Sequence, residues 1–331
     1  HLSIRRQRQM CIRDRVFNTS MTGYQEILTD PSYKGQIVTM TYPHIGNYGV
    51  NERDFESFRP FVEGFVVREY CRKPSNWRSV VPLGAFMEAY GIVGVEGVDT
   101  RCITKHVRTV GAQRSIITSE KISPTAAVER ARASDGIVGR DLVQFVTCQS
   151  PYEWGAESYD LRGGRDGKPL GSQKPLPWEA GDAQAAEESL GLEPLFRPAL
   201  PFRVVAMDCG IKHNILRRLQ AYGLSVVVVP ASWPAEKILD YDPDGILLSN
   251  GPGDPEPLTQ PIETASHLIG KRPIFGICLG HQLIGLAMGG KTYKLRCGHH
   301  GGNQPVQDVS TGKVQITTQN HGFAVDMESL E

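Results

Sequence analysis

Residues 272–289 read RPIFGICLGHQLIGLAMG, and this stretch decides the fold of the C-terminal half of the chain. A short apolar run ends at Gly276, Cys278 follows, and a segment with helical spacing begins after Gly280. A nucleophile between two glycines, where a strand turns sharply into a helix, is typical of the G-x-nucleophile-x-G elbow. The helix N-terminus favours a thiolate. The pattern therefore predicts a reactive cysteine, and the alternative is a small buried cysteine at a strand end.

Strand-like and helix-like segments alternate around this turn. Strands are expected at 203–208, 224–230, 245–250 and 272–277, and helices at 211–222, 262–269 and 281–289. The unbroken apolar run LSVVVVP (224–230) indicates a strand buried on both faces. This order predicts an α/β domain over residues 203–331, with an open, mostly parallel sheet and ligands at the carboxyl ends of its strands.

The earlier part of the chain divides into three segments. Residues 16–149 combine strand-like runs at 35–43 and 63–71 with helical patterns at 79–91 and 124–133, which predicts an α+β domain. Residues 150–202 are rich in proline and are interpreted as a linker, with a short helix possible at 184–190. Residues 1–15 are basic and have no secretory signal pattern. We expect them to be a sequence artefact outside the fold, and a frayed natural terminus is the alternative.

The composition excludes several classes of protein. The chain has 331 residues, and its 36 basic and 36 acidic side chains give no general attraction to nucleic acid or to an anionic membrane. No apolar run approaches the roughly 20 residues needed to span a bilayer. The seven cysteines are widely spaced and form no C-x-x-C motif, which argues against a disulfide framework or a cysteine zinc site. We expect a reducing, cytoplasmic location.

Five further motifs accompany the cysteine elbow. SNGPGDP (249–255), GHHGGN (298–303) and QNHGFAVD (319–326), taken with FGICLGHQL, resemble the class I glutamine amidotransferases. At the N-terminal side, VFNTSMTGYQEILTDPSY (16–33) and TYPHIGNYG (41–49) resemble the small subunits of glutamine-dependent carbamoyl-phosphate synthetases. The resemblance implies a β/β/α-type N-terminal domain followed by an amidotransferase domain.

The resemblance also implies the chemistry. Cys278 would attack the side-chain amide of L-glutamine to form a thioester, and the amides of Leu279 and Gly251 would bind the oxyanion. The residues that match glutamine-contacting positions are Ser32, Gly251, Gly253, Leu279, Gln282, Asn320, Gly322 and Phe323. From the residues alone, Ser32 would be read only as part of the turn Asp30-Pro31-Ser32.

The same resemblance implies a partner, a large subunit that receives the ammonia. The resemblance implies that ATP, Mg and bicarbonate are used on that subunit, and this is consistent with the lack of a visible nucleotide-binding loop in this sequence. No cofactor, metal, nucleic acid or membrane partner is therefore expected here. The carbamoyl phosphate would serve arginine and pyrimidine biosynthesis.

The general base is missing from these motifs. In the family it is a histidine of a G-H-P-E motif beyond QNHGFAVD, and none of the nine histidines here has Glu two residues later. We therefore expect a chain truncated at its C-terminus, inactive or weak alone, with His281 or His321 as possible substitutes. The pair His299–His300 resembles a zinc pair, but no third ligand follows at a useful spacing.

Two other functions stay open at this point. The chain could be the amidotransferase subunit of another pathway, such as anthranilate or GMP synthesis, although its N-terminal region argues against this. It could also be a non-catalytic regulatory or interaction module on an amidotransferase scaffold.

Overall fold

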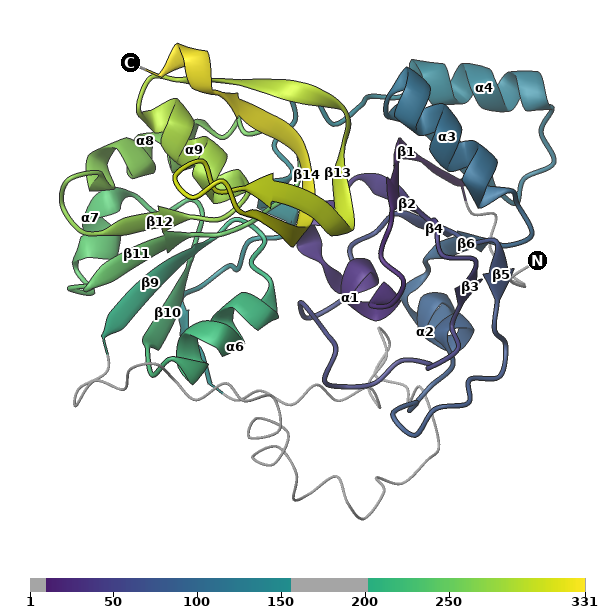
Figure 1. Cartoon of the computed structure of the whole chain (residues 1–331), viewed down its shortest axis with the longest axis horizontal. Coiled ribbons are helices and arrows are strands. Elements are labelled where there is room, and N and C mark those ends of the chain that lie inside the picture. The colour runs from purple at the N-terminus through teal and green to yellow at the C-terminus, as the bar shows by residue number, and fades with distance from the viewer. Residues whose placement is uncertain (1–9, 156–201, 331) are drawn as a thin grey trace.

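The computed structural model of the chain describes residues 10–155 and 202–330. Two domains lie side by side, each built on a five-stranded sheet, and a long β hairpin reaches from the second domain to the first (Figure 1). The first sheet is mixed and the second is mostly parallel. The predicted fold class, a mixed N-terminal domain followed by an open α/β domain, is therefore confirmed.

The sheet of the N-terminal domain is parallel except at one edge, where β7 is antiparallel to β1. Its strands, in spatial order, are β6 (Val93–Val95), β4 (Gly64–Val66), β2 (Gln36–Met40), β1 (Met10–Asn18) and β7 (Gln113–Thr118). The expected strand at 35–43 is confirmed as β2. The expected strand at 63–71 is divided between β4 and β5 (Glu69–Tyr70), which pairs with β3 (His44–Ile45) in a separate ladder.

The first strand corrects an expectation. We expected residues 1–15 to lie outside the fold, and this is wrong for Met10–Arg15, which form most of β1 between two neighbouring strands. The basic character of the segment is misleading because its side chains Cys11 and Asp14 are buried, as is Val16 after it. The buried Asp14 carboxylate is paired with Lys294 at 3.2 Å. Residues 1–9 lie outside the described part of the chain.

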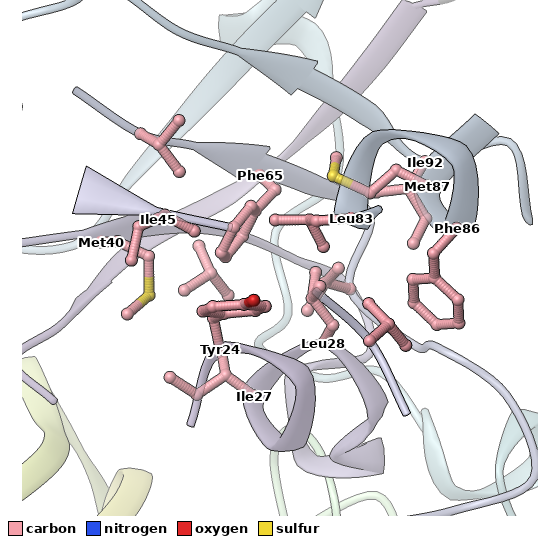
Figure 2. Packing of buried hydrophobic residues seen from close by; sticks show 14 of the residues in the cluster. Tyr24, Ile27, Leu28, Met40, Ile45, Phe65, Leu83, Phe86, Met87 and Ile92 are labelled. Carbon is pink, nitrogen blue, oxygen red and sulfur yellow. The ribbon is translucent and has the colours of Figure 1, made fainter. Parts of the chain in front are cut away.

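The main core of this domain lies between the sheet and two helices. Helices α1 (Tyr24–Thr29) and α2 (Leu83–Tyr90) contribute Tyr24, Leu28 and Phe86 to the same core cluster as Phe65 from the sheet (Figure 2). Helix α2 is shorter than the predicted 79–91 because Pro82 occupies its N-cap position.

Two helices cover the other face of the sheet. The helix predicted at 124–133 is confirmed as α4 (Pro124–Ala133), with the Ser123 hydroxyl as its N-cap. Helix α3 (Thr100–Val110) was missed, because only Thr100 and Val107 are fully buried and its apolar stripe is narrow. Ile103 of α3 packs on Ile37 of the sheet.

The second sheet is mostly parallel, as the alternating pattern predicts, and only β8 runs antiparallel to its neighbour. Its strands are β12 (Ile274–Gly276), β11 (Gly245–Leu248), β9 (Arg203–Asp208), β10 (Ser225–Pro230) and β8 (Tyr152–Glu153). Strand β8 comes from the segment interpreted as a linker and runs antiparallel to β10. The rest of that segment, 156–201 with the possible helix at 184–190, lies outside the described residues.

Alternate residues of these strands enter two different cores, as expected for strands buried on both faces. Val205 and Met207 face one core, whereas Ala206 faces the other. Helices α7 (Ala235–Leu239), α8 (Thr259–Leu268) and α9 (Leu279–Ala287) cover the first face, and α6 (His213–Ala221) covers the second (Figure 1). The predicted helices at 211–222, 262–269 and 281–289 correspond to α6, α8 and α9.

The hairpin consists of β13 (Lys291–Gln307) and β14 (Val314–Asp326), followed by a 3-10 turn at Met327–Ser329. It carries the two motifs GHHGGN and QNHGFAVD on opposite strands, so that His299 lies opposite His321 and His300 opposite Asn320. In the described residues, no helix is long and apolar enough to cross a membrane.

Candidate active site

The cysteine elbow is present as the sequence predicts. Cys278 has the backbone angles φ 54° and ψ −107° and is the N-cap residue of α9, directly after β12. Its glycine neighbours are required by space: a Cβ on Gly280 would lie 2.0 Å from the Leu248 carbonyl oxygen, and one on Gly276 2.5 Å from Gly280. A left-handed φ is costly for a residue with a side chain, and such strain is typical of functional sites.

Two backbone amides face the thiol. The N–H groups of Leu279 and Gly251 hydrogen-bond the Cys278 sulfur, and both favour the thiolate. Gly251 must lack a side chain, because a Cβ there would lie 2.1 Å from the carbonyl oxygen of Cys209. Amides in this position could bind an oxyanion that forms beside the sulfur.

The thiol is nevertheless protonated in this environment. Burial raises the pKa of Cys278 to about 11, although the nearby Lys212 ammonium lowers it. The protonated sulfur donates to the Asn320 carbonyl oxygen at 3.4 Å. A thiol in this state needs a base before it can attack, because only the thiolate is strongly nucleophilic.

A small pocket opens beside Cys278, at the carboxyl ends of β11 and β12. It is lined by predicted site residues from both domains: Ser32, Gly251, Gly253, Cys278, Gln282, Asn320, Gly322 and Phe323. Leu279 takes part through its amide instead. The structure thus brings together every site residue that the sequence predicted. It adds four lining residues that the sequence did not: Gln36, Ile137, His300 and His321.

Ser32 comes from the N-terminal domain, where it belongs to the turn expected from the sequence and also lines the pocket. The Asp30 carboxylate accepts the Ser32 N–H at 2.9 Å and so caps the short 3-10 turn Pro31–Tyr33. At the same time the Ser32 hydroxyl accepts from the Asn250 side-chain amide, also at 2.9 Å. The turn therefore holds Ser32 against the loop that contains Gly251.

Asn320 joins the hairpin to this turn. Its side-chain amide donates to the Asp30 carboxylate at 3.0 Å, and its side-chain oxygen lies 2.7 Å from Nδ1 of His300. Because the amide oxygen accepts, Nδ1 of His300 carries the proton in the neutral ring. Burial lowers the pKa of His300 to about 4, so the ring is neutral at pH 7.

Gln282 fixes the far side of the pocket. Its side-chain amide donates to the Phe323 carbonyl oxygen at 2.8 Å, and the residue is buried on α9. This bond ties the QNHGFAVD strand to the elbow helix, one turn after Cys278. Gln282 therefore orders the segment that contains Asn320 and Gly322.

Lys212 and Asp30 are site residues that sequence reasoning missed. The Lys212 ammonium lies 3.4 Å from the Asp30 carboxylate, which holds the pKa of Lys212 above its usual value. Lys212 follows β9, whose carboxyl end meets those of β11 and β12 in the same sheet. The position of Lys212 after a strand could have identified it from the sequence, because ligands bind at this edge of a parallel sheet.

Of the two histidines considered as substitute bases, His321 lines the pocket and His281 does not. His281 is exposed on α9, and His321 Nδ1 lies 2.8 Å from the Phe323 carbonyl oxygen, its hydrogen-bond acceptor. Burial lowers the pKa of His321. In residues 10–155 and 202–330, no hydrogen bond joins the Cys278 sulfur to a histidine.

The pair His299–His300 does not form a metal site. His299 is exposed and contacts His321, whereas His300 is buried, because neighbouring residues of a strand point to opposite faces. Across the described ranges, no group of three His, Cys, Asp or Glu side chains is arranged to hold a metal ion.

Two family models match the chain. Carbamoyl-phosphate synthase small chain, CPSase domain, matches residues 4–117, and Glutamine amidotransferase class-I matches residues 205–331. Together they cover the two domains and both groups of motifs.

Curated relatives match over nearly the whole chain. A carbamoyl phosphate synthase small chain from Syntrophotalea carbinolica is 52% identical over 96% of this chain and 77% of its own length. Proteins of the same name from Thermosynechococcus vestitus and Rhodopirellula baltica are 49% and 47% identical, each over 95% of this chain and 75% and 76% of their lengths. The chain belongs to the carbamoyl-phosphate synthase small-chain family, with a class I glutamine amidotransferase domain.

Proposed function

We propose that this chain hydrolyses L-glutamine at Cys278 and delivers the ammonia to a carbamoyl-phosphate synthase large chain. The observation that carries the proposal is the Cys278 sulfur on a strained elbow, with the amides of Leu279 and Gly251 hydrogen-bonded to it. Family membership supports the substrate and the partner, since the relatives are small chains of carbamoyl phosphate synthase.

The reaction divides into two steps at one sulfur atom. The thiolate attacks the carbonyl carbon of the glutamine side-chain amide, a C–S bond forms, and the amides of Leu279 and Gly251 hold the oxyanion. The C–N bond then breaks, the nitrogen takes up a proton and leaves as ammonia, and a glutamyl thioester remains. Water hydrolyses the thioester to glutamate and restores the thiol.

The step that most needs assistance is removal of the thiol proton. With a pKa of about 11, roughly one thiol in ten thousand is ionised at pH 7. Because the described histidines do not hydrogen-bond Cys278, we propose that the base is a different group, as the G-H-P-E motif of the family implies. His281 and His321 stay the alternatives.

The pocket supplies polar groups for the amino-acid end of glutamine. Ser32, Gln282 and Asn320 are suited to the α-amino and carboxylate groups, and the glycines Gly251, Gly253 and Gly322 leave room for them. The proposed partner would bind ATP, Mg and bicarbonate and combine the ammonia with activated bicarbonate to form carbamoyl phosphate for arginine and pyrimidine biosynthesis.

Trapping of the thioester tests the proposal. The chain, together with a large chain, is incubated with radiolabelled L-glutamine, quenched in acid and digested. Label is expected on the peptide that contains Cys278, and it should be absent in Cys278→Ser but present in Cys102→Ser, whose cysteine is exposed on α3. Label on another cysteine, or label that persists in Cys278→Ser, would count against Cys278 as the nucleophile.

A further inference from the structure

Loop residues 51–59 of the N-terminal domain contact the start of α6 in the amidotransferase domain. The Glu56 carboxylate accepts the Asn214 N–H at 2.9 Å, and the Glu56 carbonyl oxygen accepts the His213 N–H at 2.9 Å. The Arg217 guanidinium donates to the Phe55 carbonyl oxygen at 3.0 Å. Three successive contacts thus join this loop to the first turns of one helix.

These contacts satisfy the N-terminus of α6 from outside the domain. The residue at the N-cap is Lys212, and in the described part of the chain its side chain makes no capping hydrogen bond. The first amides of a helix need an acceptor, and a carboxylate is favoured there by the helix dipole. Glu56 supplies that carboxylate, so the position of the first turn of α6 depends on the other domain.

The capped end of α6 continues directly into the candidate active site. Lys212 precedes α6, its N–H donates to the Asn250 side-chain oxygen at 3.1 Å, and its ammonium lies 3.4 Å from Asp30. The charged groups around this ammonium are Asp30, Glu56 and the Cys278 sulfur. Arg217 in turn faces Glu56.

We propose that Glu56 is a positioning residue for the glutaminase site: by capping α6 across the domain boundary, it holds the Lys212 ammonium between Asp30 and the Cys278 thiol. The inference rests on the proposed function, but the reactivity of the Cys278 thiol can be measured without glutamine. Glu56 itself does not touch the reacting atoms. It acts through α6, and the N-terminal domain thereby becomes part of the machinery that tunes the thiol.

The test measures the alkylation rate of Cys278 by iodoacetamide as a function of pH, with the modified peptide quantified by mass spectrometry. Glu56→Ala is expected to shift the midpoint of the profile upward by roughly 0.5–1 pH unit, because the ammonium is no longer held near the sulfur. Lys212→Met should shift it at least as far. In the Lys212→Met background, Glu56→Ala should add no further shift.

Two variants control for fold and for general loosening of the domains. Lys294→Ala removes an ion pair with Asp14 between the same domains, away from α6, and should leave the midpoint unchanged. If Glu56→Ala does not fold, Glu56→Asp, whose carboxylate is one methylene short, replaces it in the same cycle. Three outcomes would overturn the proposal. The midpoint could stay unchanged in the Glu56 variant, or shift equally in Lys294→Ala. Glu56→Ala could also add its full shift in the Lys212→Met background. Loss of glutamine hydrolysis in every protein would contradict the proposed function without changing these profiles.

Discussion

At the scale of the residue, Cys278 was predictable because the motif that contains it is continuous in sequence. A Cβ on Gly276 would lie 2.5 Å from the backbone of Gly280 in the same strand–turn–helix unit, and one on Gly280 would lie 2.0 Å from the Leu248 carbonyl oxygen on the neighbouring strand β11. By contrast, His300 and Lys212 approach the thiol only after two domains and a hairpin have packed. Their chemistry could not be read from nearby residues, and the sequence left them unassigned.

The protonation of Cys278 leads to a first prediction. Because burial raises its pKa to about 11, the rate of alkylation by iodoacetamide should increase about tenfold for each pH unit between 7 and 10. Stopped-time labelling followed by mass spectrometry of the Cys278 peptide measures this rate. A plateau below pH 9 would show that the thiol is far more acidic than its surroundings indicate.

The buried ring of His300 leads to a second. Its folded pKa of about 4 lies below the ordinary value of 6.5, so the unfolded chain takes up a proton first as the pH falls. The contribution of this ring to stability is complete above pH 6.5 and is lost between pH 6.5 and 4. The free energy of unfolding should therefore fall by roughly 2 kcal/mol between pH 7 and pH 5 because of this ring.

Urea unfolding at pH 7 and pH 5 checks this linkage. His300→Gln keeps an N–H donor for Asn320 but does not titrate. Its free energy of unfolding should therefore fall by about 2 kcal/mol less than that of the parent protein over this interval. His213, whose pKa burial also lowers to about 3, still contributes in both proteins and serves as the internal reference. Equal losses in the two proteins would contradict a buried neutral His300.

At the scale of the element, the strands of the second sheet were predictable and the hairpin was not. Strands β9, β10 and β11 are short apolar runs with buried residues on both faces, a strong signal. In strand β13, apolar and polar residues do not alternate over the whole length. Its pairing with β14 is also irregular, because the register changes between Lys294 and His299 and again between Gly301 and Gln304. Besides pairing with β14, β13 contacts β1 and α3 of the N-terminal domain.

The docking of this hairpin yields a third prediction. A Cβ on Gly301, where φ is 133°, would lie 2.0 Å from the Thr19 hydroxyl, which bonds the His300 carbonyl oxygen at 3.2 Å. Gly301→Ala should therefore reduce the free energy of unfolding by roughly 1–3 kcal/mol.

Its neighbour provides the matched control. A Cβ on Gly302 would be no closer than 3.7 Å to Thr318, which is an ordinary contact, so Gly302→Ala should change stability by less than about 0.5 kcal/mol. The urea midpoints of Gly301→Ala and Gly302→Ala, each compared with the parent protein, measure this difference. If the two substitutions cost the same, the hairpin does not dock closely on Thr19.

At the scale of the whole molecule, the site is shared between the domains. Ser32 and Asp30 come from the first domain, Gly251 and Cys278 from the second, and Asn320 from the hairpin that joins them. Separate motifs in the sequence indicated most of these residues one by one. Their convergence on one pocket, and the linking role of Asp30, follow only from the packed structure.

The central claim is that Cys278 supplies ammonia from glutamine to a large-chain partner. The most direct test measures carbamoyl phosphate formed by the chain together with a large chain, with either glutamine or ammonium as the nitrogen source. Cys278→Ser should abolish the glutamine-dependent synthesis, leave the ammonium-dependent synthesis near that of the parent, and differ from Cys102→Ser, which should retain both. Glutamine-dependent synthesis that survives in Cys278→Ser, or the loss of both activities together, would contradict the account.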